Sequence, residues 1–257
     1  MTIKPAWPPN PQQWVLPDWP APDSVRACVS TRLGPGVSVA PFDRFNLGSR
    51  CGDAVEAVSA NRTALVQALD LPGAPTWLQQ VHGTTVLAIA PGASASEPQA
   101  DAAFTCLPGV VLAILTADCL PILLASDDRS EIAAVHAGWR GLSAGIVERT
   151  VAALATAPAH LVAWLGPAIG PRAYEVDAPV RDAFVAENAD ATAAFQPVRP
   201  GHWLCDLYAL ARLRLRRLGI TQISGGDLCS YADAQRFYSY RRDAAHSGRM
   251  ASLIWLK

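Results

Sequence analysis

The stretch VVLAILTADCLPILLASDDRSEIAAVHAGWRG, residues 110–141, is the most informative part of the chain for its fold. Residues 110–116, 121–125 and 131–135 are short apolar runs separated by turn residues, which predicts three strands, some of them buried on both faces. Residues 142–155 repeat apolar side chains at helical spacing and predict a helix. Buried strands followed by a helix are typical of domains that combine α and β structure.

Similar patterns continue on both sides of this stretch. Strands are predicted at residues 25–31, 76–81, 85–90, 161–165, 220–224, 237–240 and 250–255, and helices at 179–187 and 206–218. A further helix begins after Asp53, which we expect to cap it together with Glu56, and ends before Pro72. The element order is mixed, so we expect one α+β catalytic domain over residues 23–257, preceded by an extended Pro/Trp-rich segment over residues 1–22 on the surface.

The composition argues against nucleic-acid binding as the main function. The formal net charge is -1, so no overall positive field attracts phosphate backbones, and a hydrophobic content of 51% is typical of a globular domain with a well-filled core. One basic cluster lies on a helical pattern, and we interpret it as a solvated helix face. It consists of Arg212, Arg214, Arg216 and Arg217.

The N-terminus and the cysteines indicate a cytoplasmic protein. Residues 1–22 are rich in proline and tryptophan, and they contain neither the apolar core of a signal peptide nor a run that would span a membrane. The six cysteines show no CxxC motif and no framework spacing, which favours reduced thiols. We therefore expect a cytoplasmic protein with no membrane partner, while the sequence predicts no oligomeric state.

Three candidate metal ligands follow predicted strands. His82, Cys119 and His136 each come where an apolar run ends and the chain turns. If those strands are neighbours, the three side chains converge on one crevice. Two imidazoles and one thiolate suit zinc and leave a fourth position open, as in catalytic zinc sites, whereas the intervals between the three residues match no short motif. A structural role for each residue alone is the competing interpretation.

Two further signals surround His136. The glycines of HAGWRG, residues 136–141, allow a sharp turn that places Arg140 beside a helix N-terminus, where it would hold a phosphate; a capping turn with a surface arginine is the alternative. Residues 141–145, GLSAG, match the nucleophile-elbow pattern G-x-S-x-G. An elbow serine directly follows its strand, whereas Ser143 falls inside the predicted helix start, which argues against a serine hydrolase.

The same residues permit two other chemistries. Cys119 and His136 would form a metal-free thiolate–imidazolium pair, as in cysteine hydrolases. Two histidines and a cysteine are also the ligands of blue-copper sites, for which Met1 and Met250 are the available axial methionines. A third hypothesis is non-enzymatic and makes the Trp/Pro-rich N-terminus a partner-binding segment.

Five strings in this order resemble the YfiH family. They are WLQQVHG (77–83), TADCLP (116–121), AVHAGWRG (134–141), LGPAIGP (165–171) and SYRRD (239–243), and the resemblance covers about residues 25–257. That family is described as multicopper polyphenol oxidoreductase or laccase, as purine nucleoside phosphorylase and, in bacteria, as peptidoglycan editing factor. The resemblance strengthens the interpretation of His82, Cys119 and His136 as a metal site.

The resemblance implies a fold, an activity and a cofactor. The fold would be an α/β/β/α sandwich related to the cytotoxic necrotizing factor catalytic domain. The activity would be zinc-dependent phosphorolysis of adenosine, inosine, guanosine and methylthioadenosine to base plus ribose 1-phosphate, with adenosine deamination as a second activity. Purine nucleoside and phosphate would then be the partners, and Zn²⁺ the cofactor, with Cu²⁺ as the alternative metal of a single-copper polyphenol oxidase. A metal-independent cysteine hydrolase acting on a peptidoglycan precursor is the competing enzyme.

Further residues take expected roles within this resemblance. Asp118 is the candidate proton shuttle for deamination, or alternatively the carboxylate that orients a ligand imidazole. Substrate contacts are expected at Asn46, Arg62, Asp101, Arg140, Glu175 and Arg241. Arg50 stands where the family usually has histidine, which alters any imidazole role there. A multicopper cluster requires many more histidines than the five of this chain, so we do not expect one.

Overall fold

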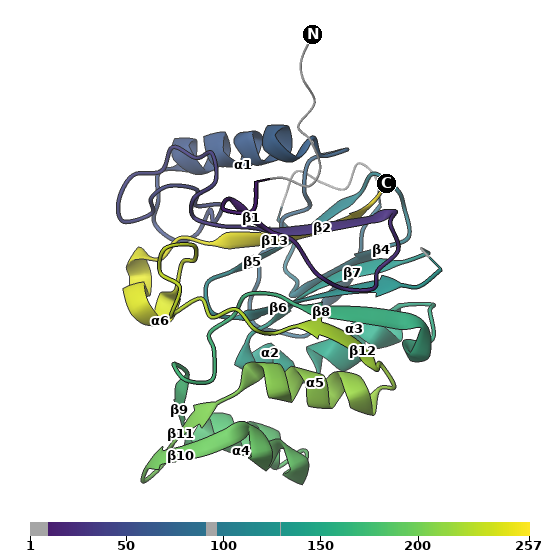
Figure 1. Cartoon of the computed structure of the whole chain (residues 1–257), viewed down its shortest axis with the longest axis vertical. Helices are drawn as coiled ribbons and strands as arrows, with labels where there is room; N and C mark the ends of the chain where they lie inside the picture. The colour runs from purple at the N-terminus through teal and green to yellow at the C-terminus, as the bar shows by residue number, and fades with distance from the viewer. Residues whose placement is uncertain (1–9, 91–96, 129) are drawn as a thin grey trace.

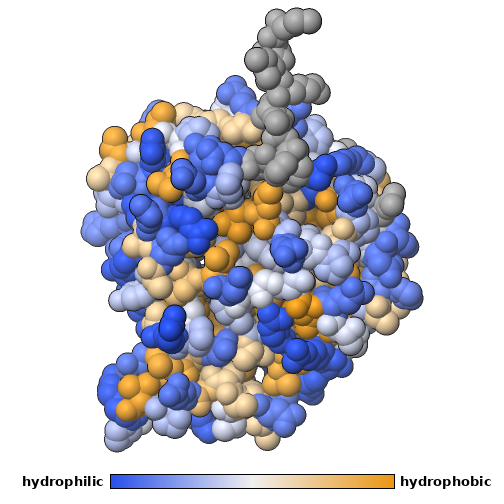
Figure 2. All heavy atoms as spheres, viewed as in Figure 1, coloured by the Kyte–Doolittle hydropathy of each residue, from blue (hydrophilic) through white to orange (hydrophobic). Residues whose placement is uncertain are grey.

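The computed structural model describes residues 10–90, 97–128 and 130–257. In these residues the elements stack as four layers, in which helix α1 (Val55–Leu69) covers one sheet, a second sheet lies beneath it, and helices cover the far side (Figure 1). On the face shown in Figure 2, hydrophobic residues gather in small patches between hydrophilic ones. No helix in the described ranges combines the length and hydropathy needed to span a membrane. The chain forms one mixed α+β domain with several sheets.

The first sheet is antiparallel and has the strand order β1-β2-β13-β5. Its strands are β1 (Trp14–Val15), β2 (Val25–Ser30), β13 (Met250–Leu256) and β5 (Val111–Thr116). Helix α1 packs on its outer face, where Leu65 and Leu69 share an apolar cluster with Val111 and Leu253. The opposite face of the same sheet meets the second sheet, so its strands are buried on both sides, as predicted for residues 110–116.

The second sheet has six strands in the order β12-β8-β6-β7-β4-β3. They are β12 (Gln222–Gly225), β8 (Leu161–Leu165), β6 (Leu120–Ser126), β7 (Ile132–Ala137), β4 (Ala102–Thr105) and β3 (Val86–Ala88). Every residue of β6 and β7 is buried, because Leu123 and Ala134 face the first sheet while Ile122 and Val135 face the helices. Strands β6 and β7 run antiparallel to each other at the centre of the domain.

Helices cover the outer face of the second sheet, and a small sheet lies beside them. The helices are α2 (Trp139–Ser143), α3 (Ile146–Ala153), α4 (Ala178–Val185) and α5 (Leu207–Arg217). The small antiparallel sheet has the order β10-β11-β9 and consists of β10 (Phe195–Arg199), β11 (His202–Cys205) and β9 (Glu175–Asp177). Short helix α6 (Tyr240–Asp243) and three 3₁₀ turns (Pro158–His160, Ala189–Ala194, Ala244–His246) complete the described elements.

Two helix predictions are corrected by the structure. The helix expected over residues 142–155 is two helices, because Gly145 adopts a left-handed φ of 91° between α2 and α3. Helix α1 begins where expected, yet its N-cap is Ala54, which makes no side-chain capping bond. The carboxylate of Asp53 instead accepts hydrogen bonds from Ser38 Oγ and Asn46 Nδ2. These bonds connect the end of the loop before α1 to earlier residues of the same loop.

Several strand predictions also differ from the structure. Residues 76–81 form only isolated bridges, from Thr76 to Leu112 and from Gln79 to Gln99. Residues 237–239 have no regular secondary structure, and Tyr240 begins α6. Strands β1, β4, β9, β10 and β11 were not predicted, and all are short. In the predicted N-terminal segment, residues 1–9 lie outside the described residues, while the buried Trp14 belongs to strand β1.

The basic cluster on α5 is a solvated face only in part, because Arg216 and Arg217 are exposed whereas Arg212 and Arg214 are not. Arg214 is buried and pairs with Glu148 of α3 and with Glu187, which lies two residues after the end of α4. Arg212 donates to the backbone oxygens of Ile223 and Gly225. Arg212 and Arg214 therefore connect helices and a strand within the domain, because their side chains point toward neighbouring elements rather than into solvent.

Candidate metal centre

Cys119 and His136 are brought together by the central antiparallel pair of strands. Cys119 directly precedes β6, and His136 is the last residue but one of β7, where it lies opposite Pro121. The start of one strand therefore meets the end of its neighbour. The expectation that three strand ends would converge is correct only in part, because β5, the strand before Cys119, belongs to the other sheet.

His82 reaches the same place from a loop rather than from a strand. Its backbone has a left-handed φ of 60°, which is uncommon for a residue with a side chain. The carboxylate of Asp101 holds this turn by accepting the backbone N–H of His82 at 2.9 Å and that of Gly83 at 2.7 Å. The loop is thereby fixed against the residue that precedes β4, the strand next to β7.

The donor atoms of His82, Cys119 and His136 all lie within 4.8 Å of one another. The Sγ of Cys119 lies 3.7 Å from Nε2 of His82, and the two imidazole rings are 4.8 Å apart at their centroids with an angle of 75° between planes. Tetrahedral zinc with ordinary bond lengths requires sulfur and nitrogen about 3.5 Å apart. The three side chains can therefore hold one metal ion after small movements.

Asp101 orients both histidines and is itself fully buried. Its Oδ1 accepts a hydrogen bond from Nδ1 of His136 at 2.8 Å, which leaves Nε2 of that ring as the ligand nitrogen. Metal-binding histidines usually have such a carboxylate behind them, because it fixes the tautomer and the ring. The sequence predicted a substrate contact for Asp101 instead, and that contact stays a prediction for this fully buried side chain.

Electrostatics within the group favour a thiolate beside an imidazolium. Burial would raise the pKa of the Cys119 thiol, but the charge of His136 and hydrogen bonds with both histidines outweigh burial and lower that pKa to about 6. Burial likewise opposes a charged His136, yet Cys119 and Asp101 raise the pKa of its imidazole to about 9. Without metal, the pair is therefore charged near neutral pH, and the thiolate is also the form that binds metal.

Gly138 leaves the space in which the ligands meet. A Cβ atom at this position would lie 2.9 Å from Sγ of Cys119 and 2.9 Å from Cδ2 of His82. Its backbone, with φ of -63° and ψ of 157°, is one that any residue adopts. The glycine of the HAGWRG string is therefore needed for its missing side chain rather than for an unusual backbone conformation.

The three donor residues line a cavity of about 410 Å³. This volume falls within the range of small-molecule sites. The other residues of its wall are Gly48, Ser49, Arg50, Cys51, Leu78, Gln80, Glu97, Leu115, Thr116, Ala117, Tyr240 and Arg249. The wall thus combines the loop before α1, the loop that carries His82, the end of β5 with the loop that follows it, and the segment before β13.

Asp118 points away from the metal ligands. Its Oδ1 accepts from Ser230 Oγ at 2.6 Å, and its Oδ2 accepts from Ser239 Oγ at 3.0 Å and from the backbone N–H of Arg241 at 2.6 Å. Asp118 therefore binds these residues rather than a ligand imidazole, and its role as proton shuttle stays a prediction. The left-handed φ of 91° at Asp118 explains the difference, because it turns the chain sharply before Cys119.

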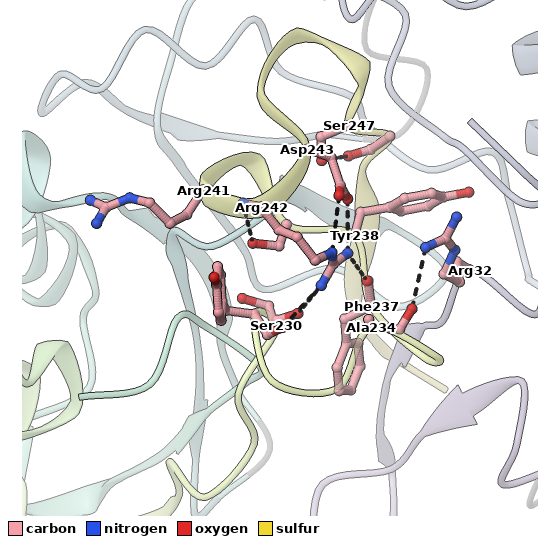
Figure 3. A network of polar contacts seen from close by, with 12 residues as sticks. Arg32, Ser230, Ala234, Phe237, Tyr238, Arg241, Arg242, Asp243 and Ser247 are labelled. Carbon is pink, nitrogen blue, oxygen red and sulfur yellow. Dashed lines mark hydrogen bonds and ion pairs between the residues drawn. The ribbon is translucent and has the colours of Figure 1, made fainter. Parts of the chain in front are cut away.

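Arg242 completes the support of the C-terminal part of the cavity wall. Its guanidinium donates to the backbone oxygens of Ser230 and Phe237 and pairs with Asp243, whereas Arg241 extends away from this network (Figure 3). These contacts fix the segment that carries Tyr240 and leads to Arg249.

Two other predicted substrate residues have structural partners. Asn46 is buried and accepts the backbone N–H groups of Gly48 and Arg249, so it connects the loop before α1 to the start of β13. Glu175 pairs with Arg199 in the small sheet at 2.6 Å. Neither residue lines the cavity.

The predicted arginines lie around the cavity rather than in it. Arg62 pairs with Glu97 at 2.8 Å and stacks over Trp77. Arg140 stacks over Trp139, and Arg241 donates to the backbone oxygen of Glu175. The helix beside Arg140, α2, has only five residues, and the phosphate contact of Arg140 stays a prediction.

Sequence reasoning missed most of the cavity wall. Gln80, Thr116 and Tyr240 adjoin or fall within strings quoted for the family resemblance, but no role was assigned to them. Arg249 and Glu97 lie in segments without any motif and become visible only when the sheets bring them to the cavity. Arg50 does line the cavity, where its Nε lies 3.5 Å from Glu97.

Fold and site together define the class as a mixed α+β single-domain protein with a His–Cys–His group that can hold a metal ion. Within that class, the chain belongs to the YfiH family, whose family model, described as multi-copper polyphenol oxidoreductase laccase, matches residues 26–257. The family resemblance inferred from the five strings is thereby confirmed.

Relatives and solved structures agree along nearly the whole chain. A Xylella fastidiosa (strain Temecula1) protein named purine nucleoside phosphorylase is 56% identical over 253 residues, covering 95% of this chain and 97% of the relative. Escherichia coli (strain K12) purine nucleoside phosphorylase YfiH is 51% identical, with 94% and 98% covered. The structure is similar to that of a Neisseria meningitidis protein, with a TM-score of 0.91, 43% identity, and 95% and 99% covered.

Proposed function

We propose that this protein is a zinc-dependent purine nucleoside phosphorylase that also deaminates adenosine. The observation that carries the proposal is the convergence of His82, Cys119 and His136 at the wall of a cavity large enough for a small molecule. The names of the relatives, purine nucleoside phosphorylase, support the substrate class. A role in peptidoglycan editing and a relation of the fold to the cytotoxic necrotizing factor domain remain predictions.

The metal would be held by two imidazoles and one thiolate. Zinc is preferred because this donor set is borderline-soft and suits tetrahedral coordination, and Asp101 supports His136 as a carboxylate supports histidine in many zinc sites. A bound zinc ion would supply Lewis acidity to a substrate group beside it.

The chain's own residues would position the nucleoside. Leu78 and Leu115 give the cavity apolar walls, on which a purine would pack. Gln80 is held rigidly, because its amide donates to the backbone oxygen of Leu115 and accepts that residue's N–H. Phosphorolysis also needs an anchored phosphate, because the sugar develops positive charge while the base leaves.

The test is product analysis with adenosine and inosine, each with and without phosphate, on protein of measured zinc content. We expect phosphate-dependent release of base and ribose 1-phosphate, and loss of both bound zinc and turnover in His82→Ala and Cys119→Ala. Cys106→Ala is the matched control, because Cys106 is an exposed thiol outside the cavity. Undiminished phosphorolysis in zinc-free Cys119→Ala would refute the proposal.

A metal-independent cysteine hydrolase acting on a peptidoglycan precursor is the second candidate. The lowered pKa of Cys119 beside His136 favours it, because this pairing also activates a nucleophile. Its activity would survive chelation, whereas that of the zinc-dependent phosphorylase would not; alkylation of Cys119 would abolish both. Elemental analysis separates zinc from copper, the metal of the alternative single-copper polyphenol oxidase.

A further inference from the structure

One cation in the cavity wall has no anionic partner among the described residues. Arg249 is half-buried, and its Nη1 donates to the backbone oxygens of Ser247 at 2.6 Å and Gly248 at 2.9 Å. No carboxylate in the described ranges forms an ion pair with it. Partial burial of an unpaired guanidinium costs free energy that an incoming anion would recover.

The neighbouring arginines differ in this respect. Arg50 and Arg62 both contact the carboxylate of Glu97, at 3.5 Å and 2.8 Å. Ser49 also donates to that carboxylate. Glu97 thus pairs with both of these arginines, whereas no carboxylate among the described residues pairs with Arg249.

A second, independent observation lies next to Arg249. Thr116 lines the cavity, and its buried hydroxyl has no hydrogen-bond partner within the described part of the chain. Thr116 is opposite Met250 where β5 pairs with β13, so the residue after Arg249 is its direct neighbour across the sheet. Thr116 and Arg249 therefore both line the same cavity, one with an unpartnered hydroxyl and the other with a guanidinium that has no anionic partner among the described residues.

We propose that Arg249 and Thr116 form an oxyanion subsite that holds the phosphate consumed in phosphorolysis. This inference rests on the proposed function and assigns the phosphate to a position different from Arg140. An arginine that keeps further N–H donors beside a hydroxyl matches the several acceptor oxygens of phosphate.

The reaction is balanced with phosphate at this subsite. A phosphate oxygen forms the new bond to C1′ of the ribose as the bond from C1′ to the purine nitrogen breaks. The electron pair leaves with the purine, which gains the proton that hydrogen phosphate loses overall. Arg249 keeps the phosphate anion oriented within the cavity that also contains the three donor residues.

The experiment is a calorimetric titration of inorganic phosphate into the full-length protein, in parallel with KM for phosphate and KM for inosine. In Arg249→Met we expect at least tenfold weaker phosphate binding, about 1.4 kcal/mol, with KM for inosine nearly unchanged. Gly48→Ala should weaken binding in the same direction while keeping the charge, because its Cβ would lie 2.6 Å from Cγ of Arg249. Glu97→Gln should strengthen binding by freeing Arg50.

Two controls keep the inference separate from the proposed function. Arg216→Met removes an exposed cation of α5, and Arg140→Met removes the one predicted from sequence; both should bind phosphate like the parent protein. Phosphate binding needs no turnover, so undiminished phosphorolysis in zinc-free Cys119→Ala with intact phosphate binding would contradict the metal proposal alone. Parent-like binding in folded Arg249→Met and Gly48→Ala, no phosphate binding by the parent, or an equal loss in Arg140→Met would overturn the subsite.

Discussion

Replacing Asp101 by asparagine tests how the metal centre is supported. The carboxylate accepts four hydrogen bonds, from Nδ1 of His136 and the backbone N–H groups of His82, Gly83 and Val81. Asparagine provides one acceptor oxygen in place of two, so two of these donors lose their partner. At about 1–1.5 kcal/mol for each lost bond, the free energy of unfolding should fall by about 2–3 kcal/mol.

The same substitution should weaken zinc binding by roughly 10–100-fold, because it loosens one ligand ring and the turn that carries the other. Competition with a chromophoric chelator measures the affinity, and urea unfolding of the metal-free protein measures the stability. Asp118→Asn is the matched control, since Asp118 is also a buried carboxylate with three donors but contacts neither histidine. Zinc affinity within twofold of the parent in Asp101→Asn, or an equal loss in Asp118→Asn, would refute the reasoning.

Three further predictions follow from the same geometry. In metal-free protein, the rate of Cys119 alkylation should rise with pH through about 6 and then level off, because the lowered pKa makes the thiolate the main form above that value, and His136→Ala should move the midpoint upward. Gly138→Ala should lower zinc affinity at least about tenfold and stability by about 1–3 kcal/mol through overpacking, as measured by chelator competition and urea unfolding; parent-like affinity would contradict the close approach of the ligands. Arg214→Met should lower the free energy of unfolding by about 2 kcal/mol, because it leaves Glu148 and Glu187 without their partly buried partner, and an unchanged urea midpoint would exclude that role.

The central strands were predictable because their signal is local. Strands β5, β6 and β7 are apolar runs bounded by turns, and burial on both faces follows from their composition. The short strands β9 and β11 carry no comparable run, and they form by pairing with distant partners. The break between α2 and α3 depends on the backbone of Gly145, which a stripe of apolar residues does not reveal.

For the site, residue type was informative and side-chain direction was not. His82, Cys119 and His136 were found because imidazole and thiol side chains follow apolar runs. Asp101, for which a substrate contact was predicted, faces His136, whereas Asp118 binds Ser230 and Ser239, because which carboxylate faces a histidine depends on strand pairing and on a left-handed turn. Neither is encoded in local composition.

The connection from β5 to β6 passes from one sheet to the other and carries Cys119 on the way. The spacing of the thiol from the end of β5 therefore depends on the apolar residues that fill the space between the two sheets. Leu112 and Leu123 are buried in this space. Because protein interiors are closely packed, a change of one methylene at either residue would alter the position of the Cys119 thiol. Selection on reactivity in this family can thus act through buried apolar residues that never contact a ligand.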